Sequence, residues 1–409
     1  MSPEYYVLIT GYIFGFYMAW NIGANDVANS MASAVGAKAL TIRQAVFVAG
    51  ILNIVGATFI GSHVTNTIRK GIVSTSILTD PRLALIGALS ALLAAALWVS
   101  FATWKSLPVS TTHSIVGSMI GFGIMAGGFS VINWGKLAAV IISWIISPLI
   151  SMVISYVMFK CIVKFILARR DPYLRAINLS KYFIGITVFI IILSFLFKTP
   201  LGKRLAMETH EALILAVIIA TGLGLLGQLA IKKFFSSKKR KADTEEIFKV
   251  IQIGTSCYVA LAQGANDVAN AIGPLAVIYF LVKKGTVGAT VPVPIFLLLF
   301  GGVGISLGIG MAGHRVMKTL GTKITTLNNT RGFSVDFAAA TTVMIASKLG
   351  LPVSTTHAAV GGVLGVGFAR GMEAVNFKII FQIIVYWILT VPAAAFTSMI
   401  IFLILKHVI

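Results

Sequence analysis

Charge is scarce in this chain of 409 residues. Only 11% of its residues are Asp, Glu, Lys or Arg, whereas soluble globular domains carry about 25%. Hydrophobic residues make up 57% of the chain, and a helix needs about 20 apolar residues to cross a bilayer. The composition excludes soluble enzymes and DNA-binding factors. It predicts an all-α polytopic membrane protein with about 12 membrane segments.

Acidic residues and cysteines are rarer still. The chain has 12 Asp and Glu against 33 Lys and Arg, a net charge of +21. The basic residues lie in short breaks between apolar runs, as in cytoplasmic loops that face anionic lipid, so the expected partner is a lipid bilayer and not nucleic acid. Cys161 and Cys257 are too few for a disulfide framework or a metal cluster. No cleavable signal peptide is expected, because residues 1–10 lack a basic n-region.

Two strings of residues each occur twice. GANDVAN stands at 23–29 and again at 264–270, and LPVSTTH stands at 107–113 and again at 351–357. The copies are 241 and 244 residues apart, so two unrelated strings are displaced by nearly the same distance. Such a displacement indicates an internal repeat. We predict two homologous halves, 1–159 and 251–409, joined by a linking section, 160–250, that holds two membrane helices and basic cytoplasmic loops.

The loops predict that the two halves have opposite orientations. Residues 160–181 and 232–249 are rich in Lys and Arg, and both are therefore expected on the cytoplasmic side. Five segments are expected in the first half: 5–36, broken near GAND, 44–64, 83–104, 107–128 and 135–159. The two in the linking section are 182–197 and 211–231. Five passes before the linking section and two within it make the first GAND segment run inward and the second outward. Inverted repeats with broken or re-entrant helices are typical of secondary transporters.

Asp26 and Asp267 are the only acids deep inside apolar segments, and they occupy the same position of the two GANDVAN copies. A carboxylate at the bilayer centre costs roughly 3 kcal/mol, so it usually faces a polar cavity and has a function. No Lys or Arg is near in sequence, which leaves Na⁺ or a proton as the counter-charge. Asn25 and Asn266 add amide oxygens suited to a hard monovalent ion. The alternative is that Asn-Asp merely caps a broken helix.

The LPVSTTH copies predict an anion site. Pro108 and Pro352 interrupt a helix, and the hydroxyl residues that follow occupy the start of the next one: Ser110, Thr111, Thr112, Ser354, Thr355 and Thr356. A helix start presents free N–H groups and a partial positive charge, which bind phosphate or sulfate without a basic side chain. The alternative is that these hydroxyls only satisfy a helix broken by proline.

Together these motifs resemble the inorganic phosphate transporter (PiT) family. The resemblance covers both halves and includes TIRKGI at 67–72 and GFSVDFAAATTVMIASKLGLPVSTTH at 332–357. It implies phosphate symport with Na⁺ or H⁺. It further implies that Asn29 and Asn270 join the hydroxyl residues in binding phosphate, and that Asn25, Asp26, Asn266 and Asp267 bind sodium. Animal members have glutamates near the positions of Asn53 and Ala88, whereas this chain keeps an acid only at Asp336, so the number of ions can differ.

We therefore expect a multi-pass protein of the cell membrane, not an enzyme, that carries inorganic phosphate by alternating access with co-transported sodium ions, and that can form a homodimer. Proton coupling, carriage of a neutral metal-phosphate complex, and sulfate transport are the nearest alternatives. An intramembrane hydrolase is disfavoured because each candidate nucleophile is doubled and no H-E-x-x-H string occurs. A channel would need a continuous polar lining, which two isolated motifs do not supply.

Overall fold

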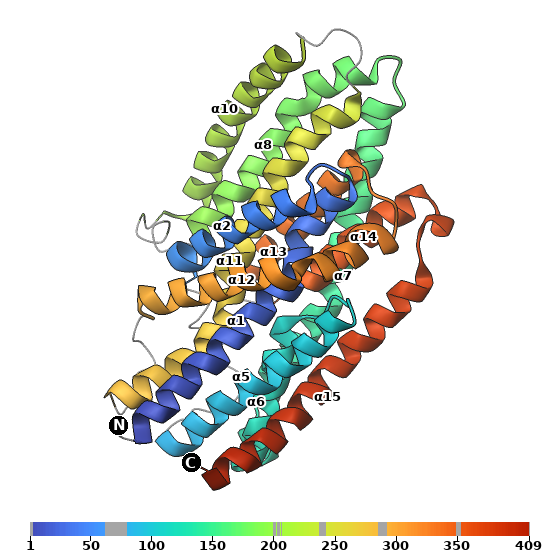
Figure 1. Cartoon of the computed structure of the whole chain (residues 1–409). Coiled ribbons are helices and arrows are strands. Elements are labelled where there is room, and N and C mark those ends of the chain that lie inside the picture. The colour runs from blue at the N-terminus through green and yellow to red at the C-terminus, as the bar shows by residue number, and fades with distance from the viewer. Residues whose placement is uncertain are drawn as a thin grey trace.

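The computed structural model describes residues 3–61, 80–198, 202, 205, 207–236, 243–284, 293–348 and 353–408. Every regular element in these ranges is a helix (Figure 1). The α-helices are α1 (Pro3–Gly36), α2 (Ile42–Ile60), α5 (Pro81–Trp104), α6 (Thr111–Gly127), α7 (Trp134–Ile162), α8 (Pro172–Lys198), α10 (Thr209–Ser236), α11 (Thr244–Lys284), α12 (Ile295–Lys318), α13 (Asn329–Lys348), α14 (Thr355–Arg370) and α15 (Phe377–Val408).

The predicted all-helical, multi-span architecture is confirmed. Among the described residues, nine helices are long and apolar enough to cross a membrane. The other three are α6, α13 and α14, of which α6 and α14 have only 17 and 16 residues. The predicted count of about 12 segments therefore matches the twelve α-helices of the described ranges, but only nine of these satisfy the length and composition of a full span.

The predicted break near GAND is wrong, because α1 and α11 run through both GANDVAN copies without interruption. The glycines of the motifs serve close packing instead. A Cβ atom on Gly23 would overlap the carbonyl oxygen of Ile305 in α12, and one on Gly264 would overlap that of Asn53 in α2. Small residues that let helix backbones approach are typical of membrane interiors.

Helices of each predicted half pack against helices of the other half. In the first half, α1 packs on α12 and α6 packs on α15. In the second half, α11 packs on α2 and α14 packs on α7. α1 and α11 also lie side by side in opposite directions, since Gly11 faces Ile278, Gly15 faces Leu275, and the Lys283 ammonium lies 5.4 Å from the ring centre of Tyr5. Figure 1 shows the start of α1 and the end of α15 at the same end of the bundle.

The linking section contains the two expected helices, but both are longer than predicted. α8 begins at Pro172 instead of 182, and α10 extends to Ser236 instead of 231. α7 continues as a π-helix over Val163–Leu167, so only a short turn separates it from α8. The basic residues of 160–181 therefore lie at the adjoining helix ends, in the turn between them and in the first three turns of α8, where long Lys and Arg side chains can reach water. Residues 237–242 lie outside the described ranges.

Candidate functional site

The chain re-enters the protein between α5 and α6. α5 ends at Trp104, which is 63% exposed, whereas residues 107–110 are buried, so α6 begins in the interior. Asn25 of α1 holds this connection: its Nδ2 donates to the Leu107 carbonyl (3.1 Å) and to Thr103 Oγ1 (2.8 Å), and its Oδ1 accepts from the Val109 N–H (3.0 Å). The connection between α5 and α6 is therefore buried and hydrogen-bonded to α1. Its second-half counterpart cannot be compared in full, because Leu351 and Pro352 lie outside the described residues.

Two serines cap the helices that follow. Ser110 and Ser354 have nearly the same extended backbone, and their Oγ atoms accept from the N–H groups of His113 and His357 at 3.2 Å each. The first N–H groups of an α-helix have no partner within the helix. The serine cap accepts from the N–H group of the third residue of each helix. The N–H groups of the first two residues, both threonines, can therefore bind a ligand. Each motif copy thus forms a serine-capped helix start, a geometry that can accept an anion.

Asp26 lies where the two motif copies meet. It is fully buried, and its Oδ2 accepts from Thr111 Oγ1 at 2.6 Å, while Oδ1 lies 3.4 Å from both Thr356 Oγ1 and Asn29 Nδ2. Thr111 belongs to the first LPVSTTH copy and Thr356 to the second. Among the described residues Asp26 forms no ion pair. A buried carboxylate held only by neutral donors is a ready ligand for a cation.

The asparagines that end the two GANDVAN copies make reciprocal contacts with the threonines of the opposite half. Asn29 Nδ2 donates to Thr355 Oγ1 (3.1 Å) and Thr356 Oγ1 (3.0 Å). Asn270 Nδ2 lies 3.3 Å from both Thr111 Oγ1 and Thr112 Oγ1. Thr355 Oγ1 in turn lies 3.4 Å from Asp267 Oδ2. The four strings predicted from sequence therefore converge on one place, although they are spread over most of the chain.

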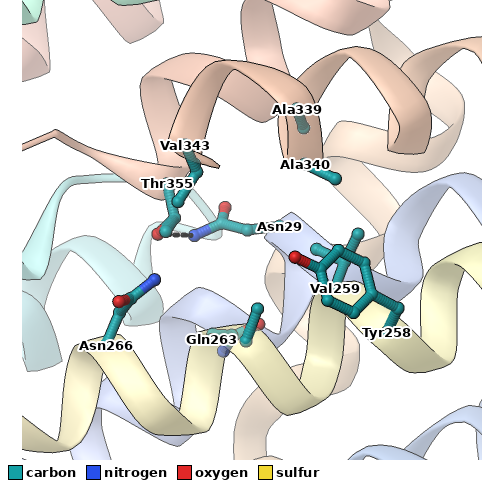
Figure 2. Close-up of a pocket in the computed structure, with 10 residues that line it drawn as sticks. Asn29, Tyr258, Val259, Gln263, Asn266, Ala339, Ala340, Val343 and Thr355 are labelled. Atoms are coloured by element: carbon teal, nitrogen blue, oxygen red, sulfur yellow. Dashed lines mark hydrogen bonds between the residues drawn. The ribbon is translucent and has the colours of Figure 1, made fainter. Parts of the chain in front are cut away.

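A pocket adjoins this place on the side of Asn266. It is lined by residues of α1, α11, α13 and α14: Asn29, Tyr258, Val259, Ala262, Gln263, Asn266, Ala339, Ala340, Val343 and Thr355 (Figure 2). Asn266 is partly exposed there, whereas Asn25, its counterpart in the first half, is buried and hydrogen-bonded. Sequence reasoning missed Gln263, although a lone amide in an apolar run directly before Gly264 was a usable signal.

Two histidines and two tryptophans stack behind the helix starts. The ring centres of Trp144 and His113 lie 3.5 Å apart, those of His113 and His357 4.4 Å, and those of His357 and Trp387 3.6 Å. His357 Nδ1 also lies 2.9 Å from the Trp144 carbonyl oxygen. This stack fixes the first turns of α6 and α14 against each other, and so sets the spacing of the two capped helix ends.

Asp336 of α13, the remaining acid of interest, links α13 to α1 and α11. It is 1% exposed, and its two oxygens accept from Ser33 Oγ of α1 and Ser256 Oγ of α11, each at 2.5 Å. The TIRKGI string at 67–72 lies outside the described residues.

Comparison with known proteins supplies a family. The model of a family described as the phosphate transporter family matches residues 22–398. A Thermococcus kodakarensis protein named as a phosphate permease is 49% identical over 410 residues, covering 100% of this chain and 99% of the relative. The chloroplastic inorganic phosphate transporter 2-1 of Arabidopsis thaliana is 42% identical, covering 94% of this chain and 69% of the relative. A solved structure described as the sodium-dependent phosphate transporter superposes with a TM-score of 0.90 at 45% identity, covering 98% of this chain and 100% of the other.

Proposed function

The chain belongs to the phosphate transporter family, so it is a transporter of phosphate and not an enzyme, and we propose that sodium ions are carried with the substrate. The observation that carries this proposal is the convergence of both motif pairs, in which two capped helix starts face two buried aspartates. A similar structure, at 45% identity, is described as sodium-dependent.

Phosphate is proposed to lie between the starts of α6 and α14. Its oxygens would accept from N–H groups and hydroxyls of Thr111, Thr112, Thr355 and Thr356, with Ser110 and Ser354 as the caps that orient both helix ends. Asn29 and Asn270 already donate to these threonines and would turn their amide groups to the substrate. Neutral donors suit transport, because the bound anion must also be released.

Sodium is proposed to neutralise the acids beside the phosphate. Asp26, Asp267 and Asn266 would supply oxygen ligands, and Asn25 would contribute the second lone pair of an Oδ1 that accepts from Val109. A phosphate anion next to two carboxylates in a low-dielectric interior is strongly repelled unless cations are bound. Sodium and phosphate should therefore bind cooperatively, which is the physical basis of symport.

Uptake into proteoliposomes tests this proposal. Labelled phosphate should enter when an inward Na⁺ gradient is imposed at equal pH, and should not enter when an inward proton gradient is imposed without sodium. The reverse result would assign the coupling to protons. Uptake that needs a divalent metal would indicate a neutral metal-phosphate complex, and competition by sulfate as strong as by unlabelled phosphate would indicate a general oxyanion carrier.

Alternating access is proposed to arise from two inverted repeats, 1–159 and 251–409, with 160–250 as the linking section. Three observations support this: α1 and α11 are antiparallel, each packs on a helix of the opposite half, and α6 and α14 do the same with α15 and α7. If the two halves exchanged conformations, the pocket beside Asn266 would close and one beside Asn25 would open. Residence in the cell membrane and a homodimer stay predictions.

A further inference from the structure

Gln263 is a buried amide in the wall of the pocket with no partner for either polar atom. It is 2% exposed, and neither Oε1 nor Nε2 makes a hydrogen bond with any described residue. Asn29 Oδ1, in the same pocket wall, is also unpartnered and its residue is 5% exposed. Unmade hydrogen bonds of buried groups are costly. In Figure 2 Gln263 lies between Asn266 and Tyr258 on α11.

The pocket joins Gln263 to the proposed phosphate site. Asn29 and Thr355 line the pocket and are hydrogen-bonded to each other at 3.1 Å. Thr355 also begins α14, one of the two helix starts that face the substrate. None of the residues that line the pocket is charged. A ligand in this pocket would therefore be recognised by amides and hydroxyls alone.

The amide is present in only one half of the protein. The residue of the first GANDVAN copy that corresponds to Gln263 is Ile22, which is fully buried. Polar groups near Ile22 are hydrogen-bonded to one another: Ser100 Oγ donates to Asn21 Oδ1 at 2.7 Å and lies 2.6 Å from the Tyr17 hydroxyl. Gln263 is thus not required by the shared packing of the two halves.

The chemistry of a primary amide selects among the possible ligands. Its N–H donor and carbonyl acceptor lie side by side. A phosphate ion near neutral pH carries both P–O⁻ and P–OH, and can therefore close two hydrogen bonds with one amide. Sulfate has no proton and would leave Oε1 facing a lone pair. Sodium would satisfy Oε1 alone and leave Nε2 unpartnered.

From this we infer that Gln263 contacts the transported phosphate at the pocket side of the site and selects a protonated oxyanion over an unprotonated one. This inference rests on the proposed function, since it takes phosphate as the substrate. The Nε2 group of Gln263 donates a hydrogen bond to an unprotonated oxygen of the substrate. Its Oε1 accepts a hydrogen bond from the P–OH group. The residue therefore sets selectivity, while the helix starts of α6 and α14 supply most of the attraction for the anion.

Equilibrium binding of radiolabelled phosphate to the purified full-length protein in detergent tests the inference, because both membrane faces are then accessible. The competitors are sulfate and monofluorophosphate, which resembles hydrogen phosphate in shape but has no P–OH at neutral pH. The wild type should prefer phosphate over either competitor by about tenfold or more, as expected for one unmade hydrogen bond of a buried group. Equal binding of all three anions by the wild type would overturn the inference without any variant.

Gln263→Met keeps the length of the side chain and removes both polar atoms. We expect about tenfold weaker phosphate binding and loss of the preference over monofluorophosphate, with the sodium dependence of binding unchanged. Gln263→Glu, which replaces the donor by a second acceptor, should bind phosphate more weakly still. A Gln263→Met protein that keeps wild-type affinity and preference would overturn the inference, and so would one that changes only in its sodium dependence.

Gln252→Met is the matched control. Gln252 lies on the same helix, is fully buried and also has an unpartnered amide, but it packs beside Gly332 and lines no described pocket. Its replacement should leave anion preference unchanged, and an equal loss of preference would contradict the inference. Failure of the proposed function is distinguishable: a wild type without phosphate uptake overturns both, whereas active wild type with an unaltered Gln263→Met variant overturns only the role of Gln263.

Discussion

Replacing Thr111 by valine tests how the buried acid at the centre of the site is held. Valine has the shape of threonine without the hydroxyl. Of the side-chain hydrogen bonds that described residues make to Asp26, only that of Thr111 Oγ1 is short, at 2.6 Å, whereas those of Thr356 and Asn29 are 3.4 Å long. A hydrogen bond to a charged group contributes about 1.5–3 kcal/mol. We expect Thr111→Val to lower the free energy of unfolding by this amount.

The second motif copy supplies the control for this prediction. Thr355 occupies the position of Thr111 in the repeat, but its hydroxyl lies 3.4 Å from Asp267 Oδ2, a distance at which a hydrogen bond is weak. Thr355→Val also removes the acceptor of the 3.1 Å bond from Asn29 Nδ2, which keeps Thr356 as a partner. Both lost bonds are weaker than the short bond from Thr111 to a carboxylate, so the cost should be about 0.5–1.5 kcal/mol. Equilibrium unfolding in mixed detergent micelles, without phosphate, measures both. Equal losses in the two variants, or an unchanged Thr111→Val protein, would refute the reasoning.

Three further substitutions test the helix packing and the hydrogen bonds around the site. Gly23→Ala should destabilise the protein by roughly 1–3 kcal/mol or more, because its Cβ meets the Ile305 backbone. Gly254→Ala, in open space on α11, should be neutral or slightly stabilising; thermal unfolding in detergent compares them, and equal midpoints would contradict the close approach. Asn25→Leu should weaken phosphate binding about tenfold by releasing the buried connection to α6, and unchanged binding in a titration with labelled phosphate would show that Asn25 does not hold it.

The helices and the motif positions could be predicted because apolar length and repeated strings are properties of the sequence itself. The break near GAND could not be judged correctly, because glycine serves equally where a helix ends and where two helices touch. Only the partner decides between these uses, and the Ile305 carbonyl lies 282 residues from Gly23. The early start of α8 was missed because Arg175 and Lys181 interrupt its apolar run, although charged residues are compatible with a helix end outside the membrane.

The site was predicted as a set of residue types but not as an arrangement. The nearly equal displacement of two motif pairs indicated that Asp26 and Asp267 act together, but not that Asn29 reaches the second LPVSTTH copy while Asn270 reaches the first. That exchange depends on the antiparallel packing of α1 and α11. The pocket with Gln263 was likewise beyond the pattern, because the first half has Ile22 at the position of Gln263 and the two halves therefore differ here.

The central claim is that one site holds phosphate and sodium together between Asp26 and Asp267, and the coupling of their binding tests it most directly. Phosphate affinity of the purified protein should be measured over a range of sodium concentrations at constant ionic strength, with choline as the replacement ion. The account predicts that sodium strengthens phosphate binding, that phosphate strengthens sodium binding by the same factor, and that Asp26→Asn and Asp267→Asn each diminish this coupling. Phosphate binding of equal strength with and without sodium would contradict it.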